Sequence, residues 1–306
     1  MKHYSSFPLI ALLLLTAAVT ACSSDDDDSI SADTNVNRND TSTEPALQRL
    51  EFPKVKGGTS RVIIHTSNDR YGINYSVEWD CDKRSQRWSC YQMTATNRVA
   101  NTSRYYPDTS KGEVQYPYDP LLPQQYYYAS DPFRGSGYDH GHICPSADRL
   151  YTVEANVQTF YLTNMQPQLH VFNAGIWESM EKKLRSWMST GSKTEDTLYV
   201  CKGGTIDAVP GGIGQPLLET LSNGLPVPRY FFIALLRKTK SGYRAMAFWV
   251  EHKNEDHTND ALGNYVINVR ELECLTGIDF FCNLPDAIEQ EVETTTVENI
   301  RWLWNL

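Results

Sequence analysis

Residues 173–188 read NAGIWESMEKKLRSWM, and this stretch has the clearest helical pattern in the chain. Its large apolar residues recur three or four positions apart, the spacing of one buried helix face: Ile176, Met180, Leu184, Trp187 and Met188. Asn173, Glu181 and Arg185 share one flank, and the last two border the buried face. Such a flank can serve a hard cation and a phosphate, although a Glu/Arg pair at this spacing is more often a surface ion pair.

Short runs rich in β-branched and aromatic residues surround this helix and are typical of strands. They lie at residues 61–66, 73–80, 88–94, 160–165, 197–201, 230–236 and 245–250. Further helices are expected at 269–275, before Gly277, and after Pro285. Strands mixed with segregated helices predict an α+β fold with a mixed or antiparallel sheet core, and not a doubly wound parallel sheet.

The composition fits a soluble folded protein with a mildly acidic core domain. Of 306 residues, 41% are hydrophobic and 21% charged, which excludes a wholly disordered chain. The net charge is −9, and residues 1–48 hold two basic and seven acidic residues, so they carry −5 and the rest carries −4. A binding site for a polyanion must therefore rest on a local basic cluster or a metal ion.

The N-terminus reads as a targeting segment. Lys2 and His3 precede an apolar run at 7–19, too short for a membrane span and typical of a signal peptide. The run ends at residues 19–22 in Val-Thr-Ala-Cys, which resembles the bacterial lipobox. The resemblance implies a lipoprotein signal peptide at 1–21 and lipidation of Cys22; the alternative is a cysteine that follows a signal core by chance.

Residues 22–50, rich in Ser, Asp, Asn and Thr, are expected to form a flexible acidic tether, with the folded domain at 51–306. The acidic run at 25–28 resembles the signal that takes some Gram-negative lipoproteins to the cell surface. The expected location is therefore the outer membrane, anchored through Cys22 and exposed at the surface if that signal operates. A plain solvated tether would have the same composition.

Six cysteines follow Cys22, an even number in an oxidising compartment, so we expect disulfides. Cys81 and Cys90 flank a polar turn, Cys274 and Cys282 flank a short segment around Gly277, and Cys144–Cys201 follows only by elimination. A structural zinc site is the alternative, but the chain has no CxxC pair.

The sequence Asp139-His140-Gly141-His142 follows a glycine-rich turn and a long irregular loop at 105–132. On an extended segment, His140 and His142 project from the same face. They could ligate a metal ion, or they could be two partly exposed histidines in a turn.

Together with the helix, these residues resemble the DNA/RNA non-specific endonucleases of the His-Me finger, or ββα-metal, class. The resemblance is to an Asp-Arg-Gly-His motif at 139–142 with Pro-x-Ala-Asp at 145–148, to Thr-Asn-x-x-Pro-Gln at 163–168, and to Asn-x-Gly-x-Trp-x-x-x-Glu-x-x-x-Arg from Asn173 to Arg185. It covers most of residues 60–290 and implies metal-dependent hydrolysis of phosphodiester bonds in DNA and RNA, without sequence specificity.

The resemblance also implies roles for single residues. His142 would be the general base that activates water, and Asn173 the direct ligand of Mg²⁺, with Mn²⁺ as the alternative metal. Glu181 would hold metal-bound waters, and Arg185 would steady the phosphate. We interpret Asp139 as orienting the loop or an imidazole; a purely structural role in the turn is the alternative.

One position departs from the family pattern, because His140 stands where the family has arginine. We expect His140 to contact the substrate with a weaker, pH-dependent charge. Arg104 or Arg134 could supplement it, or either could be an ordinary loop arginine. Two other functions stay open: a degenerate relative that binds nucleic acid without cleaving it, and an adhesin-like lipoprotein whose two histidines bind zinc.

Overall fold

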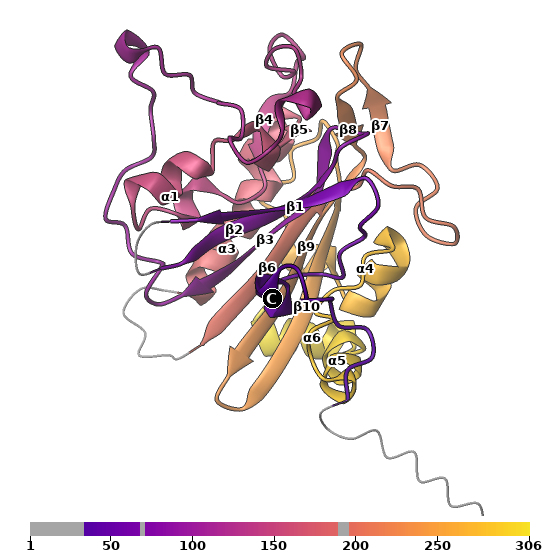
Figure 1. Ribbon diagram of the computed structural model, residues 1–306. Coiled ribbons are helices and arrows are strands. Elements are labelled where there is room, and N and C mark those ends of the chain that lie inside the picture. Colours follow the sequence, from indigo (N-terminus) through magenta and orange to yellow (C-terminus); the bar gives the residue numbers. More distant parts are fainter. Residues whose placement is uncertain (1–33, 68–70, 189–195) are drawn as a thin grey trace, which may run out of the picture.

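The computed structural model describes residues 34–67, 71–188 and 196–306, and a twisted seven-stranded sheet forms its centre (Figure 1). Its order is β1-β2-β3-β6-β9-β10-β11, and every neighbouring pair is antiparallel. The strands are β1 (Ser60–Thr66), β2 (Ile73–Asp80), β3 (Ser85–Thr94), β6 (Thr197–Gly204), β9 (Tyr230–Thr239), β10 (Gly242–Glu251) and β11 (Val266–Ile267). The predicted α+β class with an antiparallel core is confirmed.

Two short ribbons and several helices complete the fold. The ribbons are β4 (Asp139–His142) with β5 (Met165–Gln168), and β7 (Leu217–Thr220) with β8 (Pro226–Pro228). The α-helices are α1 (Val153–Gln158), α2 (His170–Phe172), α3 (Glu178–Trp187), α4 (Val269–Thr276), α5 (Asp286–Glu293) and α6 (Val297–Trp304). A wide π-helical turn, η6 (Asn173–Trp177), joins α2 to α3.

Side chains alternate along each strand, so neighbouring residues point to opposite faces of the large sheet. Both faces are buried. On β9, Ile233 packs into the core beneath α3, whereas Phe232 and Ala234 pack into a second core beneath α4 and α5. The helices therefore lie on both sides of the sheet (Figure 1), and the first core holds the helix against the ribbon that carries His142.

The helix predicted at 173–188 begins earlier and contains a kink. It starts after Leu169, whose backbone N–H donates to His252 Nε2 at 2.7 Å, while His252 Nδ1 donates to the Pro228 carbonyl at 2.9 Å. Gly175 marks the kink, and a Cβ atom there would come within 2.8 Å of the Thr258 hydroxyl. Asn173 thus lies one turn inside the helix and opens the widened turn, a feature often found at functional sites.

The tether predicted at 22–50 is too long, because residues from Thr34 onward pack on the C-terminal segment. The amide of Asn35 donates to the Cys282 carbonyl at 2.9 Å, and that of Asn37 to Asp279 and Glu289 at 3.0 and 2.9 Å. The polar residues that suggested a solvated linker are thus used as hydrogen-bonding groups. The signal peptide, Cys22 and the acidic run at 25–28 lie outside the described residues.

The strand predicted at 160–165 is also displaced. A 3-10 turn, η5 (Leu162–Asn164), occupies half of it, and strand β5 begins only at Met165. Asn164 is fully buried and bonds to both the N–H and the C=O of Cys144, so a side chain supplies the pairing that a strand backbone would have made.

The six cysteines in the described part of the chain are free thiols, so none of the three expected disulfides is present there. The β2–β3 hairpin is tight, with Asp80 opposite Ser85 and Ser76 opposite Cys90, which separates Cys90 from Cys81 at the turn. Cys90 instead faces Cys201 on β6.

The other two expected disulfides are absent as well. In one pair only one cysteine is buried, and in the other pair the cysteines lie on opposite sides of the sheet. Cys274 is exposed on α4, whereas Cys282 is buried and accepts a contact from the Asn39 amide. Cys144 lies in the core beneath α3 and Cys201 in the core beneath α4, so the sheet stands between them.

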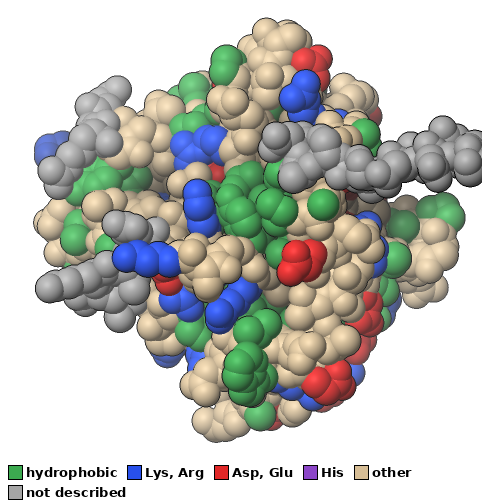
Figure 2. All heavy atoms as spheres, turned by 90° about the horizontal axis from the view of Figure 1, so that it is seen from below, with side chains coloured by type: hydrophobic (Ala, Val, Ile, Leu, Met, Phe, Trp, Pro, Cys, Tyr) green, Lys and Arg blue, Asp and Glu red, His purple; other side chains and the backbone are tan. Residues whose placement is uncertain are grey.

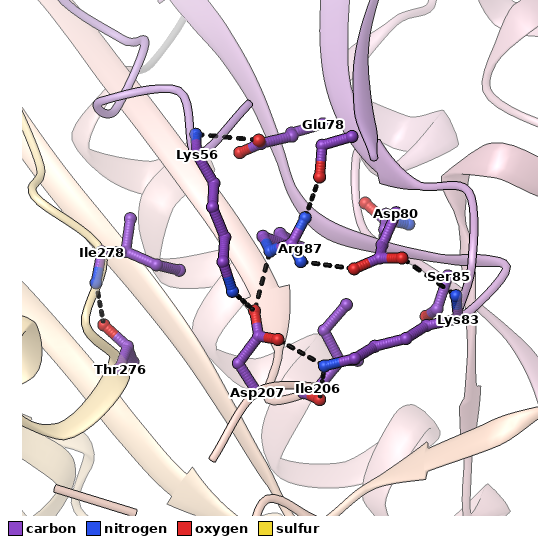
Figure 3. Close-up of polar contacts among 12 residues, drawn as sticks. Lys56, Glu78, Asp80, Lys83, Ser85, Arg87, Ile206, Asp207, Thr276 and Ile278 are labelled. Carbon is purple, nitrogen blue, oxygen red and sulfur yellow. Dashed lines mark hydrogen bonds and ion pairs between the residues drawn. The ribbon is translucent and has the colours of Figure 1, made fainter. Parts of the chain in front are cut away.

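A charge network ties the β2–β3 turn to the segment after β6 (Figure 3). Arg87 donates through Nε to Asp207 at 2.7 Å and also bonds to Asp80, while Lys56 and Lys83 pair with the same Asp207 carboxylate. These cations hold the pKa of Asp207 well below its usual range. The cavity beside the network measures about 10 Å³, room for about one water, so the network is structural.

The surface carries charges of both signs. On the face seen from below, basic side chains gather on one side and acidic ones on the other, with apolar groups between them (Figure 2). Any attraction for a polyanion must therefore come from a local cluster, as the composition predicts.

Within the described ranges no helix has the length and apolar character to cross a bilayer.

We expect the stability of the fold to depend on pH through His252. Burial lowers its pKa to about 4, against about 6.5 in an unfolded chain, so the unfolded state binds the proton more strongly. This contribution is complete above pH 6.5 and is lost as the pH falls toward 4; between pH 7 and 5 it amounts to about 2 kcal/mol.

The variant His252→Gln keeps one acceptor and one donor but has no proton to gain. Urea unfolding at pH 7 and pH 5 should show a loss of stability about 2 kcal/mol smaller in the variant than in the wild type. Equal losses in the two proteins would show that His252 does not carry this pH dependence.

Candidate active site

His142 ends strand β4 with its imidazole enclosed and one nitrogen unused. Its ring packs edge-on against Phe160 at 4.9 Å and near Tyr116 at 6.2 Å, and its backbone carbonyl accepts a bond from the Trp177 indole at 3.4 Å. Nε2 is buried and has no hydrogen-bond partner among the described residues. A buried ring nitrogen without a partner is available to a ligand or a water molecule.

The pKa of His142 is lowered to about 3, first by burial and then by the positive charge of Arg104. His140 and Lys202 act in the same direction, while a backbone hydrogen bond to His140 opposes them. His142 is therefore neutral at physiological pH, and its free nitrogen is a proton acceptor.

Asp139 orients Asn173. The carboxylate oxygen Oδ2 of Asp139 accepts the Asn173 amide at 3.0 Å and His170 Nδ1 at 2.8 Å. Because the amide nitrogen is used in this way, the Asn173 carbonyl oxygen points elsewhere and accepts no hydrogen bond from the described residues. Asp139 therefore contacts an imidazole, that of His170, and also holds the Asn173 amide.

Glu181 and Arg185 lie on the flank of α3 where the helical spacing places them, and each has a buried partner. Lys202 on β6 donates to Glu181 Oε1 at 2.6 Å, and its side chain is 0% exposed. Arg185 donates to Asp148 at 3.1 Å and stands 3.9 Å from the other oxygen of Glu181. Burial raises the pKa of Glu181, and the charge of Lys202 opposes that rise.

His140 is held in an aromatic sandwich. Its ring stacks on Tyr116 at 3.6 Å and on Phe133 at 4.5 Å, and Nε2 bonds to both carboxylate oxygens of Asp131 at 3.0 Å. Asp131 offsets any charge that His140 carries. The structure therefore ties His140 to the long loop that crosses the site.

Of the two arginines considered as supplements to His140, Arg104 lies beside His142. Its guanidinium sits over the Phe160 ring at 4.7 Å, the ring that also contacts His142, and its charge lowers the His142 pKa. Arg134 is exposed, and its charge helps to lower the pKa of Asp131. Arg104 thus supplies a permanent charge at the site.

Gly141 is required because Gln168 on β5 crosses directly over it. A Cβ atom at position 141 would come within 2.3 Å of the Gln168 side chain. The Gln168 amide is fully buried, and neither its oxygen nor its nitrogen has a partner among the described residues.

These groups fit a hard divalent cation that keeps most of its waters. Within the described ranges no cluster of three or more His, Cys, Asp or Glu residues could hold a metal, which excludes an all-protein cage there. The uncommitted oxygen of Asn173 and the orphaned buried nitrogen of His142 are instead the groups that a hydrated ion and an attacking water require. Mg²⁺ accepts such a sparse site because it dehydrates reluctantly.

Several residues of the site were not found from the sequence. Lys202, Asp131 and His170 lie far from one another in sequence and in no helical or strand register with His142. Only three-dimensional pairing makes them neighbours. Asp148 was visible in the Pro-x-Ala-Asp stretch, but nothing in its spacing indicates that it pairs with Arg185.

Comparison with known proteins agrees with this geometry. Residues 58–287 match the family model of the DNA/RNA non-specific endonucleases. A nuclease of Nostoc sp. is 29% identical over 72% of this chain and 75% of its own length, and nuclease C1 of Cunninghamella echinulata is 26% identical over 74% and 85%. The mitochondrial nuclease EXOG of Xenopus laevis is 25% identical over 70% of this chain and 58% of its own.

Among solved structures, the EndoG/EndoGI complex contains a chain with the same fold. The TM-score is 0.60 at 18% identity, covering 79% of this chain and 94% of that chain. The match of the family model over residues 58–287 shows that this chain belongs to the DNA/RNA non-specific endonuclease family, a family of metal-dependent phosphodiester hydrolases.

Proposed function

We propose that the protein hydrolyses DNA and RNA without sequence preference, with His142 as the general base and Asn173 as the direct ligand of Mg²⁺ or Mn²⁺. The observation that carries the proposal is that the buried Nε2 of His142 and the amide oxygen of Asn173 both have no hydrogen-bond partner among the described residues. A general base and a metal ligand need free groups of this kind.

The protein's own residues divide the work. His142 Nε2 takes a proton from the attacking water, and the amide oxygen of Asn173, held through Asp139, would ligate the metal. When bound, the divalent cation supplies positive charge to the phosphate and the leaving oxygen. Glu181, with one oxygen on Lys202, keeps its other oxygen for water, and Arg185 steadies the phosphate.

Arg104 takes the part expected of His140. Asp131 offsets any charge on His140, whereas Arg104 is exposed beside His142. Contacts of this kind reach the phosphate backbone and not the base edges, which suits cleavage without sequence preference.

For the metal ligand, we expect Asn173→Ala to reduce plasmid cleavage by at least about 100-fold while the fold survives. Glu181→Ala should have a smaller effect, because water-mediated contacts can rearrange. Asn299→Ala, which changes an exposed asparagine on α6, is the matched control. Cleavage and Mn²⁺ binding, followed by electron paramagnetic resonance, report on the site; wild-type values in Asn173→Ala would rule out this ligand.

The low pKa of His142 makes it a weak base until substrate arrives. A phosphate beside Arg104 offsets one of the positive charges that lower this pKa, so substrate binding raises the pKa toward the working range. His142 should therefore become a better base in the complex than in the free protein.

We expect the acid limb of kcat/KM, which reports the free enzyme, to lie well below pH 6.5, and the acid limb of kcat to lie higher. His142→Ala should lower kcat by about 100- to 10,000-fold and leave DNA binding largely intact. Initial rates across the pH range at saturating Mg²⁺ test both statements, with His257→Ala as the control. An acid limb of kcat/KM at or above pH 6.5, or an active His142→Ala, would contradict this assignment.

We also propose that Cys22 is lipidated and anchors the enzyme in the outer membrane, with surface exposure if the acidic run at 25–28 acts as an export signal. The support is the sequence of residues 19–22 and the composition before Thr34. Cys22→Ser should move the protein from the membrane fraction to the soluble fraction and abolish labelling by a fatty-acid analogue. Cys274→Ser, which changes an exposed thiol, should do neither. Membrane retention of Cys22→Ser would exclude this anchor.

A further inference from the structure

Around Arg185 of α3, the basic side chains outnumber the carboxylates. Asp148 is 1% exposed and receives two guanidinium groups on one oxygen: Arg185 at 3.1 Å and Arg98 at 3.8 Å. Its other oxygen accepts the Tyr91 hydroxyl at 2.9 Å. Arg149, fully buried, covers the Tyr91 ring at 4.4 Å. One carboxylate thus faces three guanidinium groups.

The wider site does not correct this imbalance. Glu181 is already paired with Lys202, so four cations (Arg98, Arg149, Arg185 and Lys202) share two carboxylates. Arg149 satisfies its terminal nitrogens on the carbonyl groups of Asp148 and Gln92, both at 3.0 Å. Arg98 is left with the weakest pairing.

Arg98 is placed to bind an anion that approaches from solvent. Its side chain is 12% exposed, its Nε is buried without a partner among the described residues, and its contact with Asp148 is long. Arg185, 18% exposed, opens to solvent beside it. Burial lowers the pKa of Arg98; the Asp148 carboxylate opposes this fall, and Arg185 and Arg149 add to it.

We propose that Arg98 binds a second backbone phosphate of the nucleic acid, next to the phosphate that Arg185 steadies. A planar guanidinium with free donors matches a phosphodiester anion, and a polyanion supplies such a charge without the protein burying another carboxylate. Arg185 and Arg98, which share one oxygen of Asp148, then offer two guanidinium groups to neighbouring phosphates. This subsite rests on the proposed function.

The matched pair for the test is Arg98→Gln and Arg38→Gln. Each removes one positive charge, but Arg38 is exposed on the N-terminal segment, away from the site. Arg98→Lys keeps the charge and loses the planar fork. Thermal unfolding of all variants establishes that the fold is kept.

The first readout is binding of a labelled double-stranded oligonucleotide in EDTA, which requires no cleavage. Arg98→Gln should weaken binding by roughly tenfold and reduce the slope of log affinity against log salt by about 0.9, the value for one lost phosphate contact. Arg98→Lys should keep the slope and lose less affinity, and Arg38→Gln should match the wild type. Arg98→Gln with the slope and affinity of Arg38→Gln would overturn the proposal.

The second readout compares substrates in Mg²⁺. A long DNA carries the second phosphate, whereas a dinucleoside monophosphate has one phosphodiester only. Arg98→Gln should raise KM for the long DNA and leave kcat/KM for the dinucleoside monophosphate unchanged. An equal loss on both substrates would overturn the proposal, because Arg98 would then act at the reacting phosphate. If the wild type cleaves neither substrate, the proposed function fails, and the binding measurement still decides the subsite.

Discussion

The site depends on one carboxylate oxygen, Oδ2 of Asp139, which accepts both the Asn173 amide and His170. This contact joins strand β4 to the helix and decides which way the Asn173 amide faces. An asparagine side chain can rotate its amide at little cost, so a ligand oxygen is useful only when its nitrogen is held. The surrounding fold serves this contact: Gln168 over Gly141 fixes the ribbon, and His252 fixes the start of the helix.

In the site, positively charged side chains outnumber carboxylates, so part of the positive charge stays unbalanced until an anion binds. Lys202 and three arginines meet only Asp148 and Glu181, and the positive charge of Arg104 and Lys202 lowers the pKa of His142. Leaving cations short of partners costs stability, and the cost is recovered when an anion binds. In the proposed mechanism, a phosphate that binds beside Arg104 also raises the pKa of His142, because its negative charge offsets that of the guanidinium.

The parts of this structure that follow a local period could be predicted from the sequence, and those that depend on pairing across the fold could not. The apolar face of the helix and the flank with Glu181 and Arg185 follow from a period of 3.6 residues, and most strands follow from short β-branched runs. Asn35 and Asn37 look like linker residues until the carbonyl and carboxylate groups of residues 279–289 are placed beside them. The expected disulfide between Cys81 and Cys90 is absent for the same reason, because short spacing along the chain does not determine strand register.

The substitution of the family's arginine by His140 shows how such a departure can leave a site intact. An arginine at position 140 could stack on Tyr116 and Phe133 and pair with both oxygens of Asp131, which are the contacts that His140 makes. In either case Asp131 balances the charge, so little of it reaches a phosphate. What the position requires is a flat, hydrogen-bonding group that holds the long loop against β4, and an imidazole meets that requirement. The catalytic charge can then be carried by Arg104, which the loop brings to the Phe160 ring beside His142.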